Sequence, residues 1–512
     1  MRVYLALASL MLGLCQSAGA SVAAPPPGPA AKKAAEHAVK AYRGELVDSL
    51  AAMVRFNTVA DKSVPFERNP HHLGFKHYLK THAAHLGLDY ADHGYVVVIG
   101  LGQSSERVGI ITHGDIQPVD PSKWKKSPFE LDRTSEPGRL VGRGTEDDKG
   151  PIATAMYAMK AIKDQKLALS KRLELYVYMA EESDWSHLVE FLKTHKAPQV
   201  NITIDAQYPV VTAEKGYGTI SATMPPARAP GQAPGTAPAS PAMPYVGAFT
   251  GGFFNSQIPE DASATIEHAT PELEAQIRTR AAAQKGMRYT YAWQGRQLSI
   301  GALGVSAHSS KPEDGVNAIS MLADVLKVQA WPNNTAGALV NFLNDMIGTG
   351  LYGEQFGAIA YRDPFMGPMT LAPTVIKQTG EALQLNINMR RPRGKTRAEL
   401  ESDVRAALDA WQARRVALSD IKVQISDPWI QESAPQVPTL LSVFSYYTGT
   451  KNPQPVAIGG GTNSRLFPHA VSFGPAMPGT VYFGHSEHEF ITVKQLLLNL
   501  KMYTAAMVEL AK

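Results

Sequence analysis

Residues 142–151 read Gly142-Arg143-Gly144-Thr145-Glu146-Asp147-Asp148-Lys149-Gly150-Pro151, a charged turn between glycines. A helical apolar pattern follows the turn at once, at Ile152, Ala155, Met156, Met159 and Ile162. Adjacent carboxylates repel each other and are costly to desolvate, so packing alone does not account for them. We therefore expect cations in this turn, and more specifically a pair of divalent metal ions with Asp147 between them.

Length and composition indicate a soluble globular protein. The chain has 512 residues, enough for two to four domains, with 44% hydrophobic and 19% charged residues. The formal charge of +4 is small for this length and the basic residues are scattered, which argues against a nucleic-acid or membrane-surface partner. After the N-terminus, no segment is long and apolar enough for a transmembrane helix.

The N-terminus has the pattern of a secretory signal peptide, residues 1–20. A basic start is followed by the short apolar run 5–14 and the small-residue cleavage site Ala18-Gly19-Ala20. An uncleaved anchor and a lipoprotein signal are the alternatives, and Leu14 before Cys15 disfavours the second. Cleavage would remove the only cysteine, so any metal must then be held by His, Asp and Glu. We expect a periplasmic or secreted protein.

Apolar strands alternate with helices in the first half of the chain. Helical periodicity covers 38–56 and 73–86, and short β-branched runs occupy 95–100, 108–112, 172–179 and 201–204. This alternation predicts an α/β fold with a mixed, mostly parallel sheet and flanking helices. Three of these strands are followed directly by His113, by Glu181-Glu182 and by Asp205. Open α/β sheets bind their ligands at that edge.

The pattern changes near residue 214. Residues 225–244 are rich in Pro, Ala and Gly, which indicates a linker or a long surface loop. Two strand-then-helix modules follow, 297–304 with 316–328 and 383–390 with 397–414, and both strands alternate as half-exposed strands do. We predict a disordered lead at 21–37, a catalytic domain at 38–213 and 436–512, and an inserted α+β domain at 214–435. The last helix, 493–510, starts with Thr492 and Gln495 in capping-box register.

Five side chains, distant in sequence, form a metal-ligand set. They all follow strands or lie in glycine-flanked turns: His113, Asp147, Glu182, Asp205 and His485. Each is weak as a single signal, but three carboxylates and two imidazoles suit two zinc ions that share one carboxylate. Such ions lie roughly 3.5–4 Å apart, and a water between them becomes a hydroxide near neutral pH. Glu181, beside a metal ligand, is the expected general base.

The set of motifs resembles the co-catalytic zinc peptidases, a family that includes glutamate carboxypeptidase, aminoacylase, desuccinylase and carnosinase. The motifs that carry the resemblance are His113-x-Asp115, Gly142-Arg-Gly-x-x-Asp147-Asp-Lys-Gly-Pro, Glu181-Glu182, Asp205 and His485-Ser-x-x-Glu489. Further stretches are similar to the bacterial dipeptidase branch, whose members have an enlarged lid: Asp205-Ala-Gln-Tyr-Pro209, Glu214-Lys-Gly216, Phe254-Asn-Ser-Gln-Ile-Pro259 and His308-x-x-x-Pro-x-x-Gly-Val-Asn-Ala318.

This resemblance implies a role for each matching residue. Asp147 would bridge the two metals, with His113 and Asp205 on one ion and Glu182 and His485 on the other. Asp115 would orient His113, and Glu181 would be base and then acid toward the leaving amine. His308, from the lid, would stabilise the oxyanion. The substrate would be held by Asn255, by Arg390 through its C-terminal carboxylate, and by the backbone of the 459–462 turn with Gly460, Gly461 and Thr462.

Some choices stay open in the sequence. Arg391 and Arg393 compete with Arg390, and His488 competes with His485, while Glu146 and Asp148 are not expected to be ligands. Asp115 is followed by Ile116-Gln117-Pro118-Val119, which departs from the family pattern. The predicted function is a monomeric di-zinc peptidase for short peptides, most simply dipeptides, with cobalt or manganese as other possible metals. The alternatives are an N-acyl-amino-acid deacylase or carboxypeptidase on the same metal core, and a non-catalytic peptide-binding protein.

Overall fold

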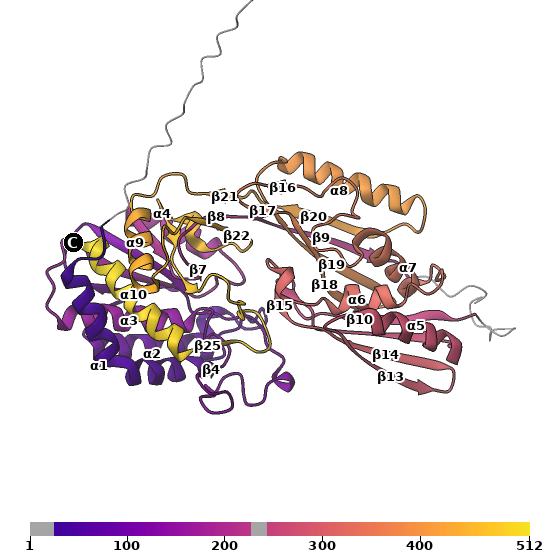
Figure 1. The fold of residues 1–512 in the computed structure, drawn as a ribbon, viewed down its shortest axis with the longest axis horizontal. Coiled ribbons are helices and arrows are strands. Elements are labelled where there is room, and N and C mark those ends of the chain that lie inside the picture. Colours follow the sequence, from indigo (N-terminus) through magenta and orange to yellow (C-terminus); the bar gives the residue numbers. More distant parts are fainter. Residues whose placement is uncertain (1–24, 227–242) are drawn as a thin grey trace, which may run out of the picture.

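The computed structural model describes residues 25–226 and 243–512, and the described chain folds into two lobes, each built on its own sheet (Figure 1). The predicted signal peptide, the start of the predicted lead and most of the proline-rich segment lie outside the described residues. Among the residues that are described, no helix combines the length and the apolar character needed to cross a membrane.

The first lobe contains a nine-stranded sheet that is built from both ends of the chain. Its strands, in spatial order, are β1 (Asp89–Asp92), β2 (Val96–Leu101), β5 (Arg172–Tyr178), β3 (Arg107–His113), β6 (Val200–Thr203), β23 (Val471–Ser472), β8 (Val211–Glu214) and β21 (Trp429–Ile430), with β22 (Val456–Ile458) also paired to β8. The centre is parallel, because β3 pairs in parallel with both β5 and β6, and β23 with β6. The β1–β2–β5 edge is antiparallel. The α/β prediction is confirmed, with more antiparallel pairing than expected.

Helices cover both faces of this sheet. One face carries α1 (Pro29–Val54), α3 (Lys149–Asp164) and α10 (Val493–Ala511), with α2 (Pro70–Leu86) and α9 (Val437–Thr448) at their sides (Figure 1). The other face carries α4 (Ser186–Thr194), whose Leu188 packs with Val96, Ile111 and Tyr176. The apolar pattern after the charged turn is confirmed, because all five of its residues are buried in α3.

The predicted disordered lead is wrong from residue 29 onward. Helix α1 begins at Pro29, and Ala31, Ala34 and Ala35 are buried in the core. Alanine has the highest helix propensity, and its small side chain lets α1 pack closely against α10. Proline fits the first helical position because its missing N–H has no partner there. An alanine- and proline-rich composition was therefore wrongly interpreted as a disordered lead.

The second lobe is the predicted inserted domain. Its eight-stranded sheet runs, in spatial order, through β13 (Arg288–Gln294), β14 (Gln297–Leu303), β12 (Asp261–Glu267), β10 (Tyr245–Gly251), β18 (Thr370–Thr379), β19 (Ala382–Arg391), β9 (Gly216–Met224) and β20 (Ser419–Ile425). The chain leaves the first sheet after β8 and returns to it at β21. The insertion therefore starts near the predicted boundary at residue 214. It ends several residues before the predicted boundary at residue 435.

The helices of this lid domain are α5 (Pro271–Ala283), α6 (Ala318–Val325), α7 (Thr335–Phe342) and α8 (Arg397–Gln412). They pack on the sheet through one apolar cluster that includes Leu298, Ile300 and Trp411. Strand β14 alternates between buried and exposed positions as predicted. Strand β19 alternates only in its first half, and its last five residues, including Arg390, are buried. That end of β19 leads toward the first lobe, beside the short ribbon β11 (Gln257–Ile258) and β15 (Ala307–His308).

The start of one predicted helix and the capping of another differ from the sequence prediction. The predicted helix 316–328 is shorter, because Asn317 caps α6 by accepting from the amides of Ile319 and Ser320. At α10, Thr492 accepts from the Gln495 amide as expected, at 3.0 Å. The Gln495 side chain does not close the box, since it donates to Pro475 O and Asn499 Oδ1 instead.

Candidate metal centre and substrate cavity

The charged turn is held by one buried carboxylate, Glu489. Its Oε1 accepts from the amides of Glu146 and Asp147, at 2.9 and 3.0 Å, and its Oε2 accepts from the amide of Gly144 at 3.0 Å. The Arg143 guanidinium donates to the same Oε2 at 2.9 Å. Three amides and one guanidinium on one carboxylate fix the backbone of the turn, and therefore the position of Asp147.

Two glycines are required by the shape of this turn. Gly144 has φ +86°, a conformation that other residues rarely adopt. A Cβ on Gly150 would lie 2.1 Å from the Thr145 carbonyl oxygen, so only glycine fits there. The glycines that mark this stretch in the sequence therefore permit the fold that presents its acids.

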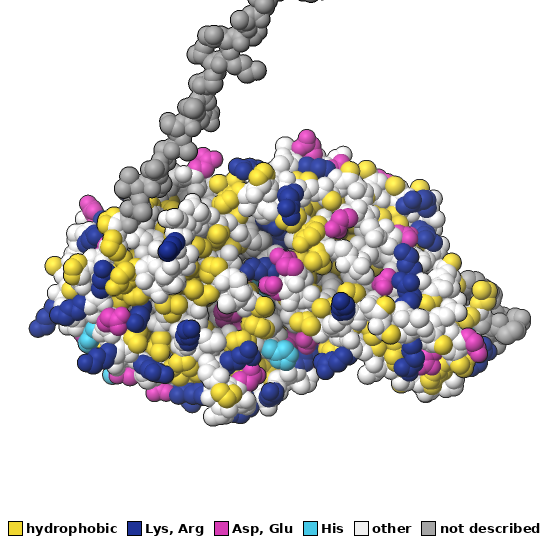
Figure 2. Space-filling view, viewed as in Figure 1, with side chains coloured by type: hydrophobic (Ala, Val, Ile, Leu, Met, Phe, Trp, Pro, Cys, Tyr) yellow, Lys and Arg dark blue, Asp and Glu magenta, His cyan; other side chains and the backbone are white. Residues whose placement is uncertain are grey.

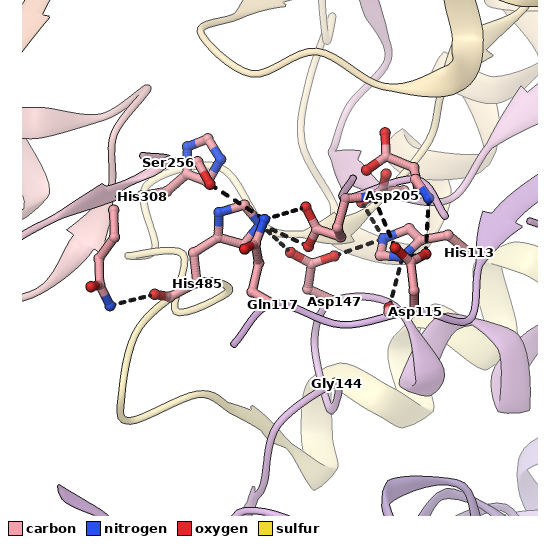
Figure 3. Close-up of polar contacts among 12 residues, drawn as sticks. His113, Asp115, Gln117, Gly144, Asp147, Asp205, Ser256, His308 and His485 are labelled. Carbon is pink, nitrogen blue, oxygen red and sulfur yellow. Dashed lines mark hydrogen bonds and ion pairs between the residues drawn. The ribbon is translucent and has the colours of Figure 1, made fainter. Parts of the chain in front are cut away.

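Asp147 lies between the two predicted imidazole ligands (Figure 3). Its Oδ1 is 2.9 Å from His113 Nε2, and its Oδ2 is 3.2 Å from His485 Nε2. Burial opposes the ionisation of Asp147, but hydrogen bonds from the two histidines outweigh it and hold its pKa well below the usual range. One oxygen facing each imidazole is the arrangement expected of a carboxylate that bridges two cations.

The remaining two predicted ligands join the same cluster. Glu182 Oε1 is 2.9 Å from His485 Nε2, and Asp205 Oδ1 is 3.7 Å from His113 Nε2. All five side chains are thus brought together, in the predicted division of two pairs around Asp147. The competitor His488 is exposed while His485 is buried.

Asp148 lies closer to this cluster than the sequence suggested. Its carboxylate, His113 and Asp205 each offer a ligand atom, all within 4.8 Å of one another, as do His113, Asp147 and Glu182. One Asp148 oxygen accepts from the Thr112 hydroxyl, and the other has no partner among the described residues. Asp147 remains the only acid of this turn whose oxygens face both imidazoles.

Asp115 connects both halves of the cluster. His113 Nδ1 is 3.1 Å from the Asp115 carbonyl oxygen and 3.5 Å from its carboxylate, which leaves Nε2 to face the acids. The two carboxylate oxygens of Asp115 accept from the amides of Glu181 and Glu182, at 2.9 and 3.0 Å. One side chain therefore orients an imidazole and fixes the turn that carries both glutamates.

The donor set fits divalent cations. Four carboxylates line one cavity, those of Asp147, Glu181, Glu182 and Asp205. Within residues 25–226 and 243–512, none of them forms an ion pair with Lys or Arg; their only such partners are the two histidines. Burying this much negative charge without cations is costly. Carboxylates and imidazoles that share one cavity are the ligands that zinc prefers.

Glu181 is the acid without a partner in this cluster. Its Oε1 is buried and makes no hydrogen bond with any described residue. Burial raises the pKa of Glu181 well above its usual value, and the nearby Asp205 carboxylate adds to the effect. A carboxylate that is held in place by its backbone and has a raised pKa suits proton transfer.

The lid contributes His308, whose ring lies 4.4 Å from that of His485 between centroids, so this lid residue reaches the cluster (Figure 3). The Ser310 amide donates to His308 Nδ1 at 3.0 Å, which places the ring proton on Nε2. Burial lowers the pKa of His308 well below its usual value, with His485 and Arg390 adding to the effect. The ring is therefore neutral at pH 7, with an N–H on Nε2 that no described residue accepts.

Arg390 differs from its two sequence competitors. Arg391 pairs with Asp427 at 2.9 Å and Arg393 with Asp363 at 3.0 Å. Arg390 is buried and its hydrogen bonds go only to neutral groups, Asn388 Oδ1 and Ser309 Oγ. No described carboxylate forms an ion pair with it. A buried guanidinium that lacks an acid partner is ready to bind an anion.

The other predicted substrate residues divide into two groups. Gly460, Gly461 and Thr462 line the cavity, although the Thr462 hydroxyl is already donated to Glu214 at 2.6 Å. Asn255 is exposed and does not line the cavity, so the structure does not bring it to the site. Its neighbour Ser256 lies closer and accepts from Gln117 Nε2 at 3.3 Å.

Three residues at the site were missed by the sequence analysis. The Tyr482 hydroxyl donates to Asp147 Oδ2 at 2.7 Å, and a Cβ on Gly484 would lie 2.2 Å from that hydroxyl. Gln117 Nε2 donates to Glu182 Oε2 at 2.7 Å. Lys311 lines the cavity from the lid. Only Gln117 had a signal in the sequence, as a departure from the family pattern after Asp115.

The cavity between the lobes is small. Its volume is about 90 Å³, and both lobes line it, the catalytic domain with the cluster and the lid with His308, Ser310 and Lys311. A larger groove of about 750 Å³ lies along the lid sheet beside Lys123. That groove contains none of the cluster residues, so its size does not make it the site.

Comparisons with known proteins agree with this geometry. The model of the peptidase family M20/M25/M40 matches residues 109–509, and the chain belongs to this family. It is 29% identical over 424 residues to a Beta-Ala-Xaa dipeptidase from Lactobacillus delbrueckii subsp. lactis, covering 82% of this chain and 85% of the relative. It is also 29% identical over 428 residues to the putative dipeptidase YtjP of Bacillus subtilis (strain 168), covering 82% and 86%.

Solved structures confirm the fold. Human carnosine dipeptidase 1 has a TM-score of 0.55 at 15% identity, over 95% of this chain and all of that chain. The dipeptidase Dug1p of Saccharomyces cerevisiae has a TM-score of 0.56 at 13% identity, over 93% and 98%. The resemblance to the co-catalytic metallopeptidases and their dipeptidase branch is therefore confirmed. The protein is a peptidase.

Proposed function

We propose that this peptidase is a dipeptidase that works with two divalent metal ions, most simply zinc. The observation that carries the proposal is Asp147, whose two oxygens each face a different imidazole inside a cavity that the lid closes. His113 and Asp205 would hold one ion, and Glu182 and His485 the other. When bound, such a pair lowers the pKa of a water and polarises the scissile carbonyl.

Glu181 moves the protons of the reaction. It takes one proton from the attacking water as the new C–O bond forms. It then gives that proton to the peptide nitrogen as the C–N bond breaks, so the amine leaves neutral. The acyl part leaves as a carboxylic acid and becomes a carboxylate by releasing the second water proton to solvent. Its raised pKa supports both steps, because a base and an acid are most effective when their pKa is near the working pH.

The lid positions the substrate. The Nε2–H of neutral His308 donates to the carbonyl oxygen as negative charge develops on it. Arg390 binds the C-terminal carboxylate with its planar fork, and Gly460 and Gly461 allow the peptide to approach the backbone. The closed lid excludes water from the reacting groups.

The size and charge of the cavity support a short substrate. A cavity of about 90 Å³, lined by both lobes and partly open to solvent, leaves little room beyond a short peptide in this conformation. One observation favours a deacylase as the second candidate. The carboxylates that line the cavity all belong to the metal cluster, so a substrate ammonium group would have no separate partner there.

The test combines metal analysis with a substrate panel. We expect about two metal ions per chain, loss of activity on chelation with recovery on adding zinc, and hydrolysis of dipeptides such as Ala-Ala and β-Ala-Ala. N-acetyl-amino acids with the same C-terminal residue are the comparison. Faster hydrolysis of the acetylated compounds would replace the proposal by the deacylase. A metal-loaded protein that cleaves neither would support the non-catalytic alternative.

We further propose that the protein is exported and acts as a monomer in the periplasm or outside the cell. The basic, apolar and small-residue pattern of residues 1–20 supports export. N-terminal sequencing of the protein purified from its native cell envelope or medium should start near residue 21, and light scattering should give the mass of one chain. A full-length cytoplasmic protein would contradict the export proposal.

A further inference from the structure

Charge is divided unequally between the two sides of the cavity. Every carboxylate that lines it comes from the catalytic domain, and the one charged side chain that the lid adds to its lining is Lys311. With two divalent ions bound, the charges of the four carboxylates would be neutralised. The positive charge of Lys311 would then have no compensating negative charge in the cavity. Arg390 is a second lid cation; it does not line the cavity, but it donates to Ser309, the residue after His308. The proposed function assigns it to the C-terminal carboxylate.

The bonding of Lys311 is incomplete. Its ammonium has three donors, and its only hydrogen bond within the described residues runs from Nζ to Gln207 Oε1 at 3.0 Å. No described carboxylate forms an ion pair with it. Gln207 is neutral and belongs to the catalytic domain, in β7 (Ala206–Gln207), so the cation is held over the cavity without being neutralised.

His308 lies close to both cations. The Lys311 amide donates to the His308 carbonyl oxygen at 3.0 Å, and Arg390 Nη2 donates to the hydroxyl of the next residue, Ser309, at 3.3 Å. The oxyanion donor is therefore placed near two cations, while an ordinary neutral dipeptide brings a single carboxylate. The second cation has no counterpart in such a substrate.

We propose that Lys311 binds a second carboxylate of the substrate, so that the preferred substrates are dipeptides containing aspartate or glutamate. This inference rests on the proposed dipeptidase function and names its substrate class. The alternative is that Lys311 and Gln207 form only a hydrogen bond between the closed lobes. Loss of such a bond would affect all substrates equally, whereas loss of a charge contact would affect only the acidic ones.

The test compares isosteric acid and amide peptides. In the metal-loaded full chain, kcat/KM is measured for Ala-Glu against Ala-Gln and for Glu-Ala against Gln-Ala. We expect the acid to be favoured about tenfold or more in at least one pair, the range of a charge-assisted hydrogen bond. Lys311→Met should bring that ratio close to one, and Lys311→Glu should reverse it.

Two variants control for the hydrogen bond and for the substitution itself. Gln207→Ala removes the partner but keeps the cation, so the acid-to-amide ratio should persist. Lys377→Met makes the same chemical change at an exposed position of β18 and should also keep the ratio. Equal rates within both wild-type pairs, or a ratio that survives in Lys311→Met, would overturn the inference.

Binding separates this inference from the proposed function. Calorimetry on the Glu181→Gln protein measures the affinity for Ala-Glu and Ala-Gln without turnover. Tighter binding of the acid that depends on Lys311 supports the charge contact even if no dipeptide is cleaved, in which case the proposed function alone is wrong. Hydrolysis of dipeptides with equal binding of acid and amide leaves the function intact and overturns the inference.

Discussion

The two sides of the cavity carry opposite charge and are built differently. On the catalytic side, acids and imidazoles contact one another and are held by buried groups such as Glu489 and Asp115. On the lid side, Lys311 and Arg390 contact only neutral groups. The space-filling view shows charged side chains of both signs where the lobes meet (Figure 2). This difference in charge supports the two proposals above, that the catalytic side holds cations and that the lid side receives an anionic substrate.

Glu181→Gln should have the largest effect and test the catalytic side. The amide keeps the shape but cannot accept the proton, so we expect kcat to fall about 10³-fold or more, near the upper range for general acid–base catalysis. Metal content by elemental analysis should stay near two ions per chain. Glu190→Gln, on an exposed part of α4 where Glu190 pairs with Lys193, is the control and should keep full activity. Normal turnover of Glu181→Gln would refute the base assignment.

Arg390→Met should test the lid side. Removing a charge-assisted contact to the C-terminal carboxylate should lower kcat/KM about 100-fold, from a loss near 3 kcal/mol. Metal content should not change, because Arg390 contacts none of the ligands. Arg393→Met is the matched control, since Arg393 pairs with Asp363 and is half exposed. An equal loss of activity in both variants would contradict the assignment of the substrate carboxylate to Arg390 alone.

Tyr482→Phe should test how strongly the catalytic side binds metal. The hydroxyl orients Asp147 through Oδ2, and outer partners of ligands typically contribute about 10–100-fold in metal affinity. Titration with a competing chelator should show that the variant binds metal about 10–100-fold more weakly than the wild type. The fold of the variant should not change. Tyr446→Phe, at an exposed position of α9, should leave metal affinity unchanged. Unaltered affinity in Tyr482→Phe would mean that Glu489 and the histidines suffice to hold the carboxylate.

Lys123→Ala should have the smallest effect. Lys123, in the short helix η2 (Pro121–Lys123), pairs across the lobes with Glu260 at 3.2 Å and with Asp261. Partly exposed ion pairs contribute about 0.2–1 kcal/mol, so KM should rise about two- to fivefold with kcat little changed. Raising the ionic strength should reduce the difference between variant and wild type. A large fall in kcat would instead link this contact to the chemistry.

Local sequence rules predicted much of the catalytic side. A ligand at the end of a strand can be predicted because the carboxyl ends of parallel strands share one edge of the sheet. His113 ends β3 and Asp205 follows β6, and these two strands are neighbours. The glycines around Asp147 could also be interpreted from the local sequence, because a tight turn requires a positive φ such as that of Gly144. The error at α1 has a local origin too, since the same alanines suit either a linker or a closely packed helix.

The lid side was predicted less well. The sequence could not separate Arg390 from Arg391 and Arg393, because their acid partners Asp427 and Asp363 are decided by packing. Asn255 matched a motif and yet is exposed and does not line the cavity, while Lys311 matched none and lines it. Arg393, Arg391 and Lys311 contact partners that are 30, 36 and 104 residues away. Spacing along the chain does not contain that information.

The sequence by itself determined which groups we propose for the chemistry, because residue type fixes what a side chain can bind and local backbone rules place it at a strand end or a tight turn. Only the tertiary structure decided what surrounds those groups. The hydroxyl of Tyr482 on Asp147 and the amide of Gln117 on Glu182 join segments 335 and 65 residues apart. Such contacts depend on how distant segments pack within the first lobe, and packing is a property of the whole chain.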